Sequence, residues 1–391
     1  MRFDSSWDRE GESFDKMGLP LKVLRGIYTY GFEKPSPIQQ RAIKPIISGR
    51  DVIAQAQAGT GKTGAFVIGG LARVDPKFRE TQILVVSPTR ELARQSHKVA
   101  KCLSDYTDIT MHLCVGGTRV SEDKATFRHG VQMAFGTPGR INHLLRTRVL
   151  RTENVKMIVV DEADEMLSQG FEEQIYDIFG SLNQDVQVVL VSATMPAEVL
   201  QITERFMRDP VKMLIKQSAI NLEGIKQFYI ALDHRDWKLP TLLDIYKEIS
   251  INQSIIFANT RSTVKWLQDE LTRRDHMVSA IHGDMEDQER KDVVKDFRRG
   301  SSRVLISTDI LARGIDFQNL SLVINFDLPR EKANYIHRIG RAGRYGRKGM
   351  AINFVTNRDA RWMKELEAFY DFSWKELPNN IQSICEQSCS S

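Results

Sequence analysis

The sequence predicts an α/β fold in two successive domains, each a parallel β-sheet covered by helices. The chain has 391 residues, which is long for one ordinary domain and sufficient for two. Short β-branched runs, each ending in a small or polar residue, alternate with longer amphipathic stretches. This is the pattern of buried parallel strands connected by helices. The pattern lapses near 218–224 and then restarts, so we expect a linker there.

The apolar runs place the expected strands. In the first half they are Val52–Ala54, Ile83–Val86, Met157–Val160 and Val186–Val191. In the second half they are Ser254–Phe257, Arg303–Ser307 and Leu322–Phe326. Surface helices are expected at Thr263–Arg274 and Asp287–Phe297. The predicted organisation is a loose N-terminal segment (1–13), a first domain (14–217), the linker (218–224), a second domain (225–378) and a tail (379–391).

Composition limits the function classes only loosely. A formal net charge of +5 permits a polyanionic partner without requiring one. The chain has four cysteines, too few for a disulfide framework in a chain of this size. Cys385 and Cys389 read as unpaired thiols, because no further Cys or His pair lies nearby to complete a metal site. Neither a signal peptide nor an 18-residue apolar run is visible, so we expect an intracellular protein.

A phosphate-binding loop is predicted directly after the first strand. Ala56 opens a segment that ends in Gly-Lys-Thr and precedes an apolar, helix-like run; its candidate ligand-binding residues are Ala58, Gly59, Thr60, Gly61, Lys62 and Thr63. Glycines let backbone N–H groups curl around a phosphate, and the following helix N-terminus adds positive partial charge. Lys62 can reach the β- and γ-phosphates, and the Thr63 hydroxyl can hold Mg²⁺. The alternative is a strand-to-helix turn without a ligand.

Two adjacent acids follow the predicted strand Met157–Val160. In a phosphate-loop protein an acid at this place holds Mg²⁺, and Asp161 fits that role. Glu162 can polarise the attacking water as a general base. Acids at a strand end can also simply cap a helix, but the upstream phosphate loop favours metal binding and catalysis.

The run Asp161-Glu162-Ala163-Asp164, with that loop upstream, resembles the DEAD-box RNA helicases. Further segments are similar to the family's motifs in the same order: Phe14 with Gly31–Gln39, Pro88–Ala93, Gly116–Gly117, Thr137–Arg140, Ser192–Thr194, Ser307–Asp309, Ala312–Asp316 and His337–Arg344. The resemblance extends from about Phe14 to about Pro378. It implies two tandem RecA-like domains and an RNA-stimulated ATP hydrolase that uses ATP and Mg²⁺.

The resemblance also implies roles for individual residues. Adenine is uncharged, so an aromatic ring such as Phe32 and a side-chain amide such as Gln39 suit its face and its edge. Ser192 and Thr194 are expected near the acids and are implied to link hydrolysis to unwinding. Arginine fingers stabilise the charge that develops on the γ-phosphate, and Arg341 and Arg344 are assigned that task. Further implied nucleotide contacts are Lys34, Gly314, Asp316 and Tyr345.

Single-stranded RNA is expected to lie across both domains. Donors directed at its backbone would hold it irrespective of sequence. The candidates are Pro88, Thr89, Arg90, Gly117, Thr137 and Arg140 in the first half and Arg261, Arg290, Gly300 and Thr308 in the second. One departure from the family is Asp287, which stands where Gln is common. An acid there would repel RNA phosphates.

The hypothesis for the mechanism is that ATP and RNA together close the two domains, because Lys62 and Glu162 lie in one half and Arg341 and Arg344 in the other.

Motif-flanking segments resemble the translation-initiation branch of the family. That branch implies local unwinding of mRNA leaders, a monomeric core, a scaffold partner of the cap-binding complex and a cytoplasmic site. One alternative is an ATP-gated RNA clamp of the exon-junction or ribosome-biogenesis type, which would be nuclear or nucleolar. The others are a small-molecule phosphotransferase and, less favoured, a DNA helicase.

Overall fold

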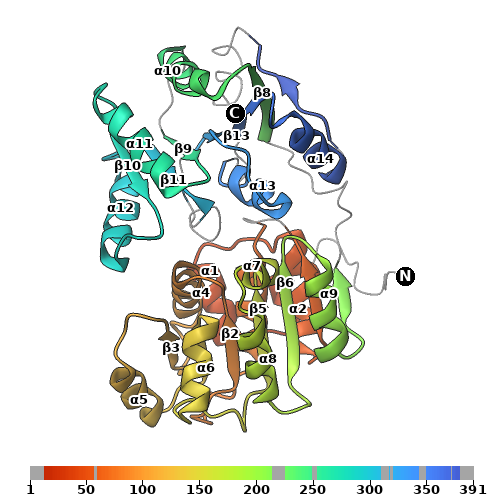
Figure 1. The fold of residues 1–391 in the computed structure, drawn as a ribbon. Coiled ribbons are helices and arrows are strands. Elements are labelled where there is room, and N and C mark those ends of the chain that lie inside the picture. The colour runs from red at the N-terminus through yellow and green to blue at the C-terminus, as the bar shows by residue number, and fades with distance from the viewer. Residues whose placement is uncertain are drawn as a thin grey trace. The chain divides into compact units, whose positions relative to one another are not determined.

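The structure is a computed structural model that describes residues 13–56, 60–213, 225–248, 253–309, 317, 320–342, 349–370 and 372–378. The chain divides into two compact units, Met1–Ile215 and Lys216–Ser391, which are described separately below as unit 1 and unit 2 (Figure 1). The predicted linker at 218–224 lies outside the described residues, as do 1–12 of the predicted loose segment and the tail at 379–391. The predicted domain limits stay predictions.

Unit 1 contains a seven-stranded sheet in which every pairing is parallel, with the order β3-β4-β2-β5-β6-β1-β7. Its strands are β1 (Val52–Gln55), β2 (Ile83–Val86), β3 (Met111–Cys114), β4 (Met133–Gly136), β5 (Met157–Asp161), β6 (Gln187–Ser192) and β7 (Val211–Met213). The central strands are buried along their whole length. Their β-branched runs therefore meet apolar side chains on both faces.

Helices cover both faces of this sheet (Figure 1). One face packs against α1 (Leu21–Thr29), α2 (Pro37–Ile47), α3 (Lys62–Arg73) and α4 (Arg90–Leu103). The other face packs against α6 (Pro138–Arg146), α7 (Ala163–Ser168), α8 (Glu172–Gly180) and α9 (Ala197–Phe206). The 3₁₀ helix η2 (Phe14–Met17) joins the first core, and α5 (Val120–His129) lies between β3 and β4 in sequence.

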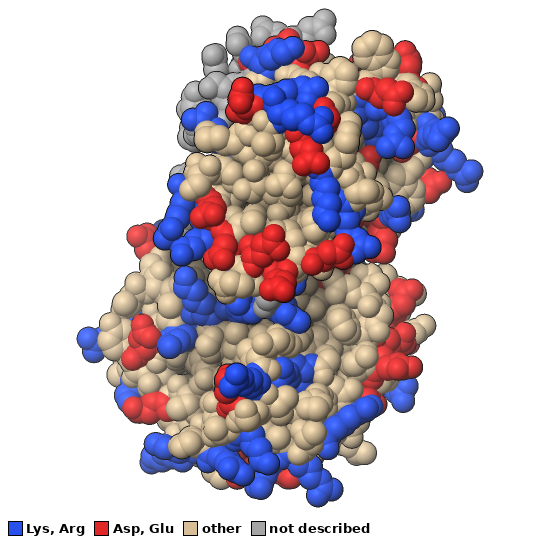
Figure 2. All heavy atoms as spheres, turned by 60° about the vertical axis from the view of Figure 1, so that its left-hand side comes forward, with Lys and Arg blue, Asp and Glu red and all other residues tan. Residues whose placement is uncertain are grey.

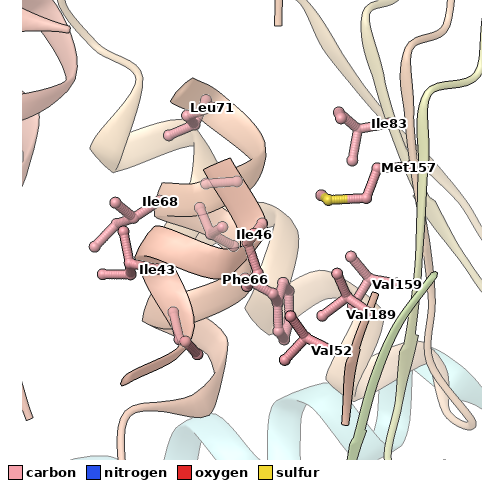
Figure 3. Close-up of a cluster of buried hydrophobic side chains, with 14 of the residues drawn as sticks. Ile43, Ile46, Val52, Phe66, Ile68, Leu71, Ile83, Met157, Val159 and Val189 are labelled. Carbon is pink, nitrogen blue, oxygen red and sulfur yellow. The ribbon is translucent and has the colours of Figure 1, made fainter. Parts of the chain in front are cut away.

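Close packing of α2 and α3 positions the start of α3 beside the sheet. Figure 3 shows Ile43 of α2 beside Ile68 of α3, Ile46 of α2 near Phe66 of α3, and Phe66 next to the strand residue Val52. All of these side chains are buried. A Cβ at Gly69 would lie only 2.5 Å from Cγ2 of Ile46. The absence of a side chain at this position therefore lets the two helices approach closely.

Unit 2 contains a second seven-stranded parallel sheet, with the order β10-β11-β9-β12-β13-β8-β14. Its strands are β8 (Ile225–Leu232), β9 (Ser254–Phe257), β10 (Val278–Ile281), β11 (Val304–Ser307), β12 (Leu322–Asn325), β13 (Gly349–Thr356) and β14 (Lys375–Glu376). One core contains residues of α10 (Lys238–Glu248) and α11 (Arg261–Thr272). Two others contain residues of α12 (Asp287–Arg299), α13 (Lys332–Ile339) and α14 (Ala360–Tyr370). A short 3₁₀ helix, η4 (Arg235–Trp237), precedes α10.

The predicted fold class is confirmed. Every strand predicted from an apolar run is present and agrees with its expected limits to within one residue at each end. The two predicted surface helices are α11 and α12, each displaced or extended by two residues. Seven further strands were not predicted from the sequence: β3, β4, β7, β8, β10, β13 and β14.

Candidate nucleotide and RNA site

Three neighbouring strands of unit 1 end at one edge of the sheet, and the predicted phosphate-binding and acidic segments follow them directly. β1 pairs with β6, with Gln55 opposite Ser192, and β6 pairs with β5, with Val191 opposite Asp161. The Gln55 side-chain amide also donates a hydrogen bond to the Ala193 carbonyl (3.3 Å). Because open parallel sheets bind ligands beyond the carboxyl ends of their strands, this edge is the candidate nucleotide site.

The predicted phosphate loop leads into the first turn of α3. Its described residues are Thr60, Gly61, Lys62 and Thr63, whereas Ala58 and Gly59 lie outside the described residues. Gly61 caps the helix with a φ of 96°, a left-handed conformation that favours glycine. A Cβ there would also lie 2.7 Å from the Ser36 hydroxyl oxygen. The turn brings the free N–H groups of the α3 N-terminus to the end of β1, where they can meet a phosphate.

Lys62 and Glu162 form a buried ion pair across this edge. The Lys62 ammonium donates to Oε1 of Glu162 at 3.2 Å. Glu162 is the residue between β5 and α7, and its φ of 52° and ψ of 55° place a non-glycine residue in the left-handed region. This conformation costs roughly 1–2 kcal/mol and is characteristic of functional positions that the surrounding structure holds fixed.

Asp161 is the last residue of β5 and is buried. Burial is the main cause that raises the pKa of its carboxyl group above the usual range, and the neighbouring Glu162 carboxylate raises the pKa further. A divalent cation beside these two acids would favour their ionised forms. A carboxylate at Asp161 and a hydroxyl at Thr63 are hard oxygen donors of the kind Mg²⁺ prefers, so the residues present fit this metal.

A third acid of the same segment, Asp164, connects the end of β5 to the end of β6. Its backbone N–H donates to the Ser192 hydroxyl (3.3 Å), and its carboxylate accepts from the Thr194 hydroxyl (2.6 Å) and the Thr194 N–H (3.2 Å). Ser192 and Thr194 therefore contact the acidic segment, as expected. Asp164 was not predicted as a site residue, although it lies within the motif itself.

The segment expected to bind adenine packs against the phosphate loop. Gln39 of α2 accepts from the Ser36 N–H (2.9 Å) and donates to the Gly61 carbonyl (3.2 Å). A Cβ at Gly64 would lie 2.5 Å from Nε2 of Gln39 and 3.2 Å from the Phe32 ring. Both predicted residues thus lie against the first turns of α3, while Lys34 is exposed in the segment before α2.

The RNA-binding candidates of unit 1 lie at the carboxyl ends of β2, β3 and β4, which are neighbours in the sheet. Thr89 accepts a hydrogen bond from the Leu92 N–H (3.3 Å) and caps α4, and Pro88 is buried just before it. Side-chain nitrogens of Arg90 would lie 3.0 and 3.2 Å from a Cβ at Gly116 or Gly117. Because Gly116 and Gly117 have no side chains, they leave room for the Arg90 guanidinium group. Thr137 precedes α6 after β4.

Arg140 of α6 has protein partners in addition to its predicted role. Its guanidinium group donates to the Asp123 carboxylate at 2.8 Å and to the Thr118 carbonyl at 2.6 Å. Asp123 is buried and its other oxygen lies 2.7 Å from Nε2 of His112. The side chain of Arg140 is therefore held in place by α5 and the loop before it.

The candidates of unit 2 lie on several elements. Arg261 begins α11 and pairs with Asp284, Arg290 lies on α12, and Thr308 follows β11. Gly300 ends α12 with a φ of 81°. Nε of Arg341 donates to the His337 carbonyl (3.1 Å). The predicted residues Gly314, Asp316, Arg344 and Tyr345 and the side chain of Asp287 lie outside the part that the structure describes.

Arg338, which was not predicted as a site residue, is a buried cation of this region with several hydrogen-bond partners. Its guanidinium group donates to both oxygens of Asp309 (2.5 and 3.0 Å) and to the Asn259 side chain (2.8 Å). It also donates to the Asp327 carbonyl (2.7 Å) and the Asn325 side chain (3.3 Å). It therefore joins α13 to the ends of β9, β11 and β12.

Both halves of the chain match models of helicase domains. The DEAD/DEAH box helicase model matches residues 36–202, and the helicase conserved C-terminal domain model matches residues 237–346. The chain is 57% identical over 383 residues to the ATP-dependent RNA helicase eIF4A of Neosartorya fischeri, covering 98% of this chain and 96% of that protein. It is 56% identical to eIF4A of Phaeosphaeria nodorum, covering 98% of this chain and 97% of that protein. The chain belongs to the DEAD/DEAH box helicase family.

Solved structures of this helicase family agree with the assignment. The structure titled S. cerevisiae Dbp5 bound to RNA and ADP BeF3 has a TM-score of 0.90 and 36% sequence identity, covering 97% of this chain and all of that one. Mss116p bound to ssRNA and AMP-PNP has a TM-score of 0.86 and 28% identity, covering 99% of this chain and 83% of that one. In this DEAD/DEAH box helicase, no described helix has the length and apolar character to cross a membrane.

Proposed function

We propose that this chain is an ATP-dependent RNA helicase that unwinds short RNA duplexes during translation initiation. It is an enzyme of the RNA-stimulated ATP hydrolase class. The names of its eIF4A relatives and its match to both helicase domain models support this function. The geometric observation that carries the proposal is the Lys62–Glu162 pair at the ends of β1 and β5.

In the proposed reaction this ion pair opens when nucleotide binds. The phosphates take the Lys62 ammonium group, and the Glu162 carboxylate is released to orient and deprotonate the attacking water. Thr63 and Asp161 would hold Mg²⁺, which would supply positive charge to neutralise the phosphate oxygens. The left-handed backbone of Glu162 keeps its carboxylate aimed at this edge of the sheet.

The remaining nucleotide contacts are proposed from the motifs. Phe32, Lys34 and Gln39 recognise the adenine, and the packing of Phe32 and Gln39 against Gly64 supports this placement. The proposed contacts from the second half of the chain are Gly314, Asp316, Arg341, Arg344 and Tyr345. The arginines would stabilise the charge on the transferred phosphoryl group.

The RNA site is proposed to hold the sugar–phosphate backbone. In unit 1 the proposed residues follow three adjacent strands, an arrangement that suits a strand laid across the sheet edge. They are Pro88, Thr89, Arg90, Gly117, Thr137 and Arg140, with Arg261, Arg290, Gly300 and Thr308 from unit 2. Ser192 and Thr194 bond to Asp164 and in the proposal transmit the state of the acids to the RNA site.

The proposed cellular role follows the eIF4A relatives. The chain is proposed to act as a monomer in the cytoplasm on mRNA, together with a scaffold protein of the cap-binding complex. Capture of such a scaffold from cell extract by the tagged chain would support this role. Capture of splicing or nucleolar proteins in its place would contradict it.

The decisive experiment compares ATP turnover of the parent and Glu162→Gln proteins with and without single-stranded RNA. RNA should stimulate the parent, whereas DNA of the same sequence, which lacks the 2′-hydroxyl, should not. Glu162→Gln should lose at least about 100-fold in turnover and retain RNA in the presence of ATP. Turnover at the parental rate in Glu162→Gln would refute the general-base assignment. A parent that hydrolyses ATP without any response to RNA would refute the helicase assignment.

A further inference from the structure

A basic hollow of about 720 Å³ lies at the opposite edge of the unit 1 sheet, away from the proposed nucleotide site. Its walls come from three segments that precede strands or end a helix. They are residues 79–81 before β2, the end of α5 with residues 130 and 131 before β4, and the loop 147–151 after α6. The phosphate loop and the acids follow strands, so this hollow belongs to a different edge of the sheet. Figure 2 shows Lys and Arg side chains along the lower margin of unit 1.

Five cations line the hollow and give it a strong excess of positive charge. They are Arg79, Lys124, Arg128, Arg148 and Arg151. Within the part of the chain that the structure describes, none of the five forms an ion pair. Glu80, the one acid among the described lining residues, accepts a hydrogen bond from the Asn154 side chain. Like charges gathered without counter-charges repel one another, and a bound anion would remove that cost.

The backbone around the hollow is fixed rather than loose. Arg148 has a φ of 54°, a left-handed conformation that costs a non-glycine residue roughly 1–2 kcal/mol. Backbone hydrogen bonds from Arg148 to Leu145 (2.9 Å) and from Val149 to Leu144 (2.9 Å) hold it there. A Cβ at Gly130 would lie 2.7 Å from the carbonyl oxygen of Arg79, so these two walls are in close contact. Charges on a rigid frame lose little freedom when they bind a ligand.

The shape and lining of the hollow indicate the class of ligand. Its volume lies in the range of small-molecule sites. Proteins that hold single-stranded nucleic acids provide a groove with aromatic rings for stacking. Phe127 is the one Phe, Tyr or Trp of the described lining, and its ring packs edge-on to His112 with 5.5 Å between centroids. The His129 ring, also in the lining, is held through Nδ1 at 2.8 Å from the Ala125 carbonyl. The hollow thus offers charge-assisted hydrogen bonds for phosphates and little for bases.

From this cluster of unpaired cations around a rigid hollow, we propose that unit 1 carries a second anion site for a compact, multiply phosphorylated small molecule. The site is separate from the ATP site of the proposed function. Its ligand carries several phosphate groups close together, as an inositol polyphosphate or a linear polyphosphate does.

Calorimetric titration of the full chain tests this proposal with two probes, inositol hexakisphosphate and inorganic tripolyphosphate. The test variant is the double substitution Lys124→Gln with Arg128→Gln, which removes two exposed cations from one wall of the hollow. The matched control is Lys98→Gln with Lys101→Gln, two exposed cations on α4. Melting temperatures equal to that of the parent show that both proteins fold.

At least one probe should bind the parent, and the test variant should weaken that binding about tenfold or more, while the control stays within about twofold. The probe that binds distinguishes a compact ring from a linear chain. A Lys62→Ala variant should keep the parental affinity, because the phosphate loop is not involved. ATP turnover of the test variant should match that of the parent.

Four results would overturn the site. The first is that neither probe binds the parent, and the second is that the test and control variants lose affinity equally. The third is that Lys62→Ala abolishes binding, which would place the probe on the phosphate loop. A fourth is that the test variant weakens nucleotide-free binding of a single-stranded RNA tenfold and leaves both probes unaffected, which would make this face an RNA surface. None of these outcomes bears on the helicase assignment, which depends on Glu162→Gln and on RNA stimulation.

Discussion

Thr194 donates two hydrogen bonds to Asp164, one from its hydroxyl at 2.6 Å and one from its backbone N–H at 3.2 Å. Asp164 follows β5 and Thr194 follows β6, and the two strands are neighbours in the sheet. The pair therefore joins the acidic segment of the proposed ATP site to the segment that follows β6. Because both side chains are buried, a displacement of Thr194 or Asp164 must displace the other residue as well.

Replacing Thr194 by valine should separate these segments without changing the shape of the side chain. Loss of the hydroxyl leaves a buried carboxylate short of a donor, so the free energy of unfolding should fall by about 1–3 kcal/mol. Duplex unwinding per ATP hydrolysed should fall as well. Thr194→Ser keeps the hydroxyl and should restore both quantities. If Thr194→Val and Thr194→Ser behave alike in chemical denaturation and in the unwinding assay, the hydrogen bond has no role in coupling.

A methyl group at Gly64 should weaken ATP binding. Its Cβ would lie 2.5 Å from Nε2 of Gln39 and 3.2 Å from Phe32, so Gly64→Ala must displace the side chains proposed to hold adenine. The KM for ATP should rise about tenfold, equivalent to about 1.4 kcal/mol of lost binding. Gly180→Ala at the end of α8 is the control, since nothing lies within 4 Å of its Cβ. An unchanged KM in Gly64→Ala would remove these side chains from the adenine site.

Removing the charge of Arg338 should destabilise unit 2. Arg338→Met leaves Asp309 without its cation and breaks the bonds to Asn259 and Asp327, which should cost about 3–5 kcal/mol. Tryptophan fluorescence during urea unfolding measures this well, because every tryptophan except Trp7 belongs to unit 2. Exposed Arg361, replaced by Gln, should unfold with the parental midpoint. Equal midpoints for both variants would show that the Arg338 network is dispensable.

The raised pKa of Asp161 predicts a pH-dependent cost of folding. The folded protein holds the proton on this acid to a higher pH than the unfolded chain does, mainly because the carboxyl is buried. Stability from this group is therefore complete below the unfolded pKa near 4 and is lost as pH rises through the folded value. In nucleotide-free buffer with a chelator, Asp161→Asn should gain stability over the parent as pH rises from 4 to 8. A difference that is constant with pH would contradict this cost.

The sequence alone determined the fold class and the positions of the central strands along the chain. Ile83–Val86 and Ser254–Phe257 are predicted and found with identical limits. A buried parallel strand must be apolar on both faces, and the residues of the strand itself show this pattern. Strands such as β3 (Met111–Cys114) and β8 (Ile225–Leu232) were missed. Their side chains are mostly only half-buried, and a mixed pattern of that kind does not distinguish a strand from a loop.

The tertiary structure decided which of the predicted residues meet. The motifs identify Lys62, Glu162 and Thr194 one by one, but only the sheet order places β1, β6 and β5 side by side and so brings their following segments together. The same applies to Arg338 and to the basic hollow, whose walls are assembled from three distant segments. Local sequence encodes the period and burial of each strand, whereas contacts between strand ends depend on which strands pair. That choice is made by the packing of the whole sheet.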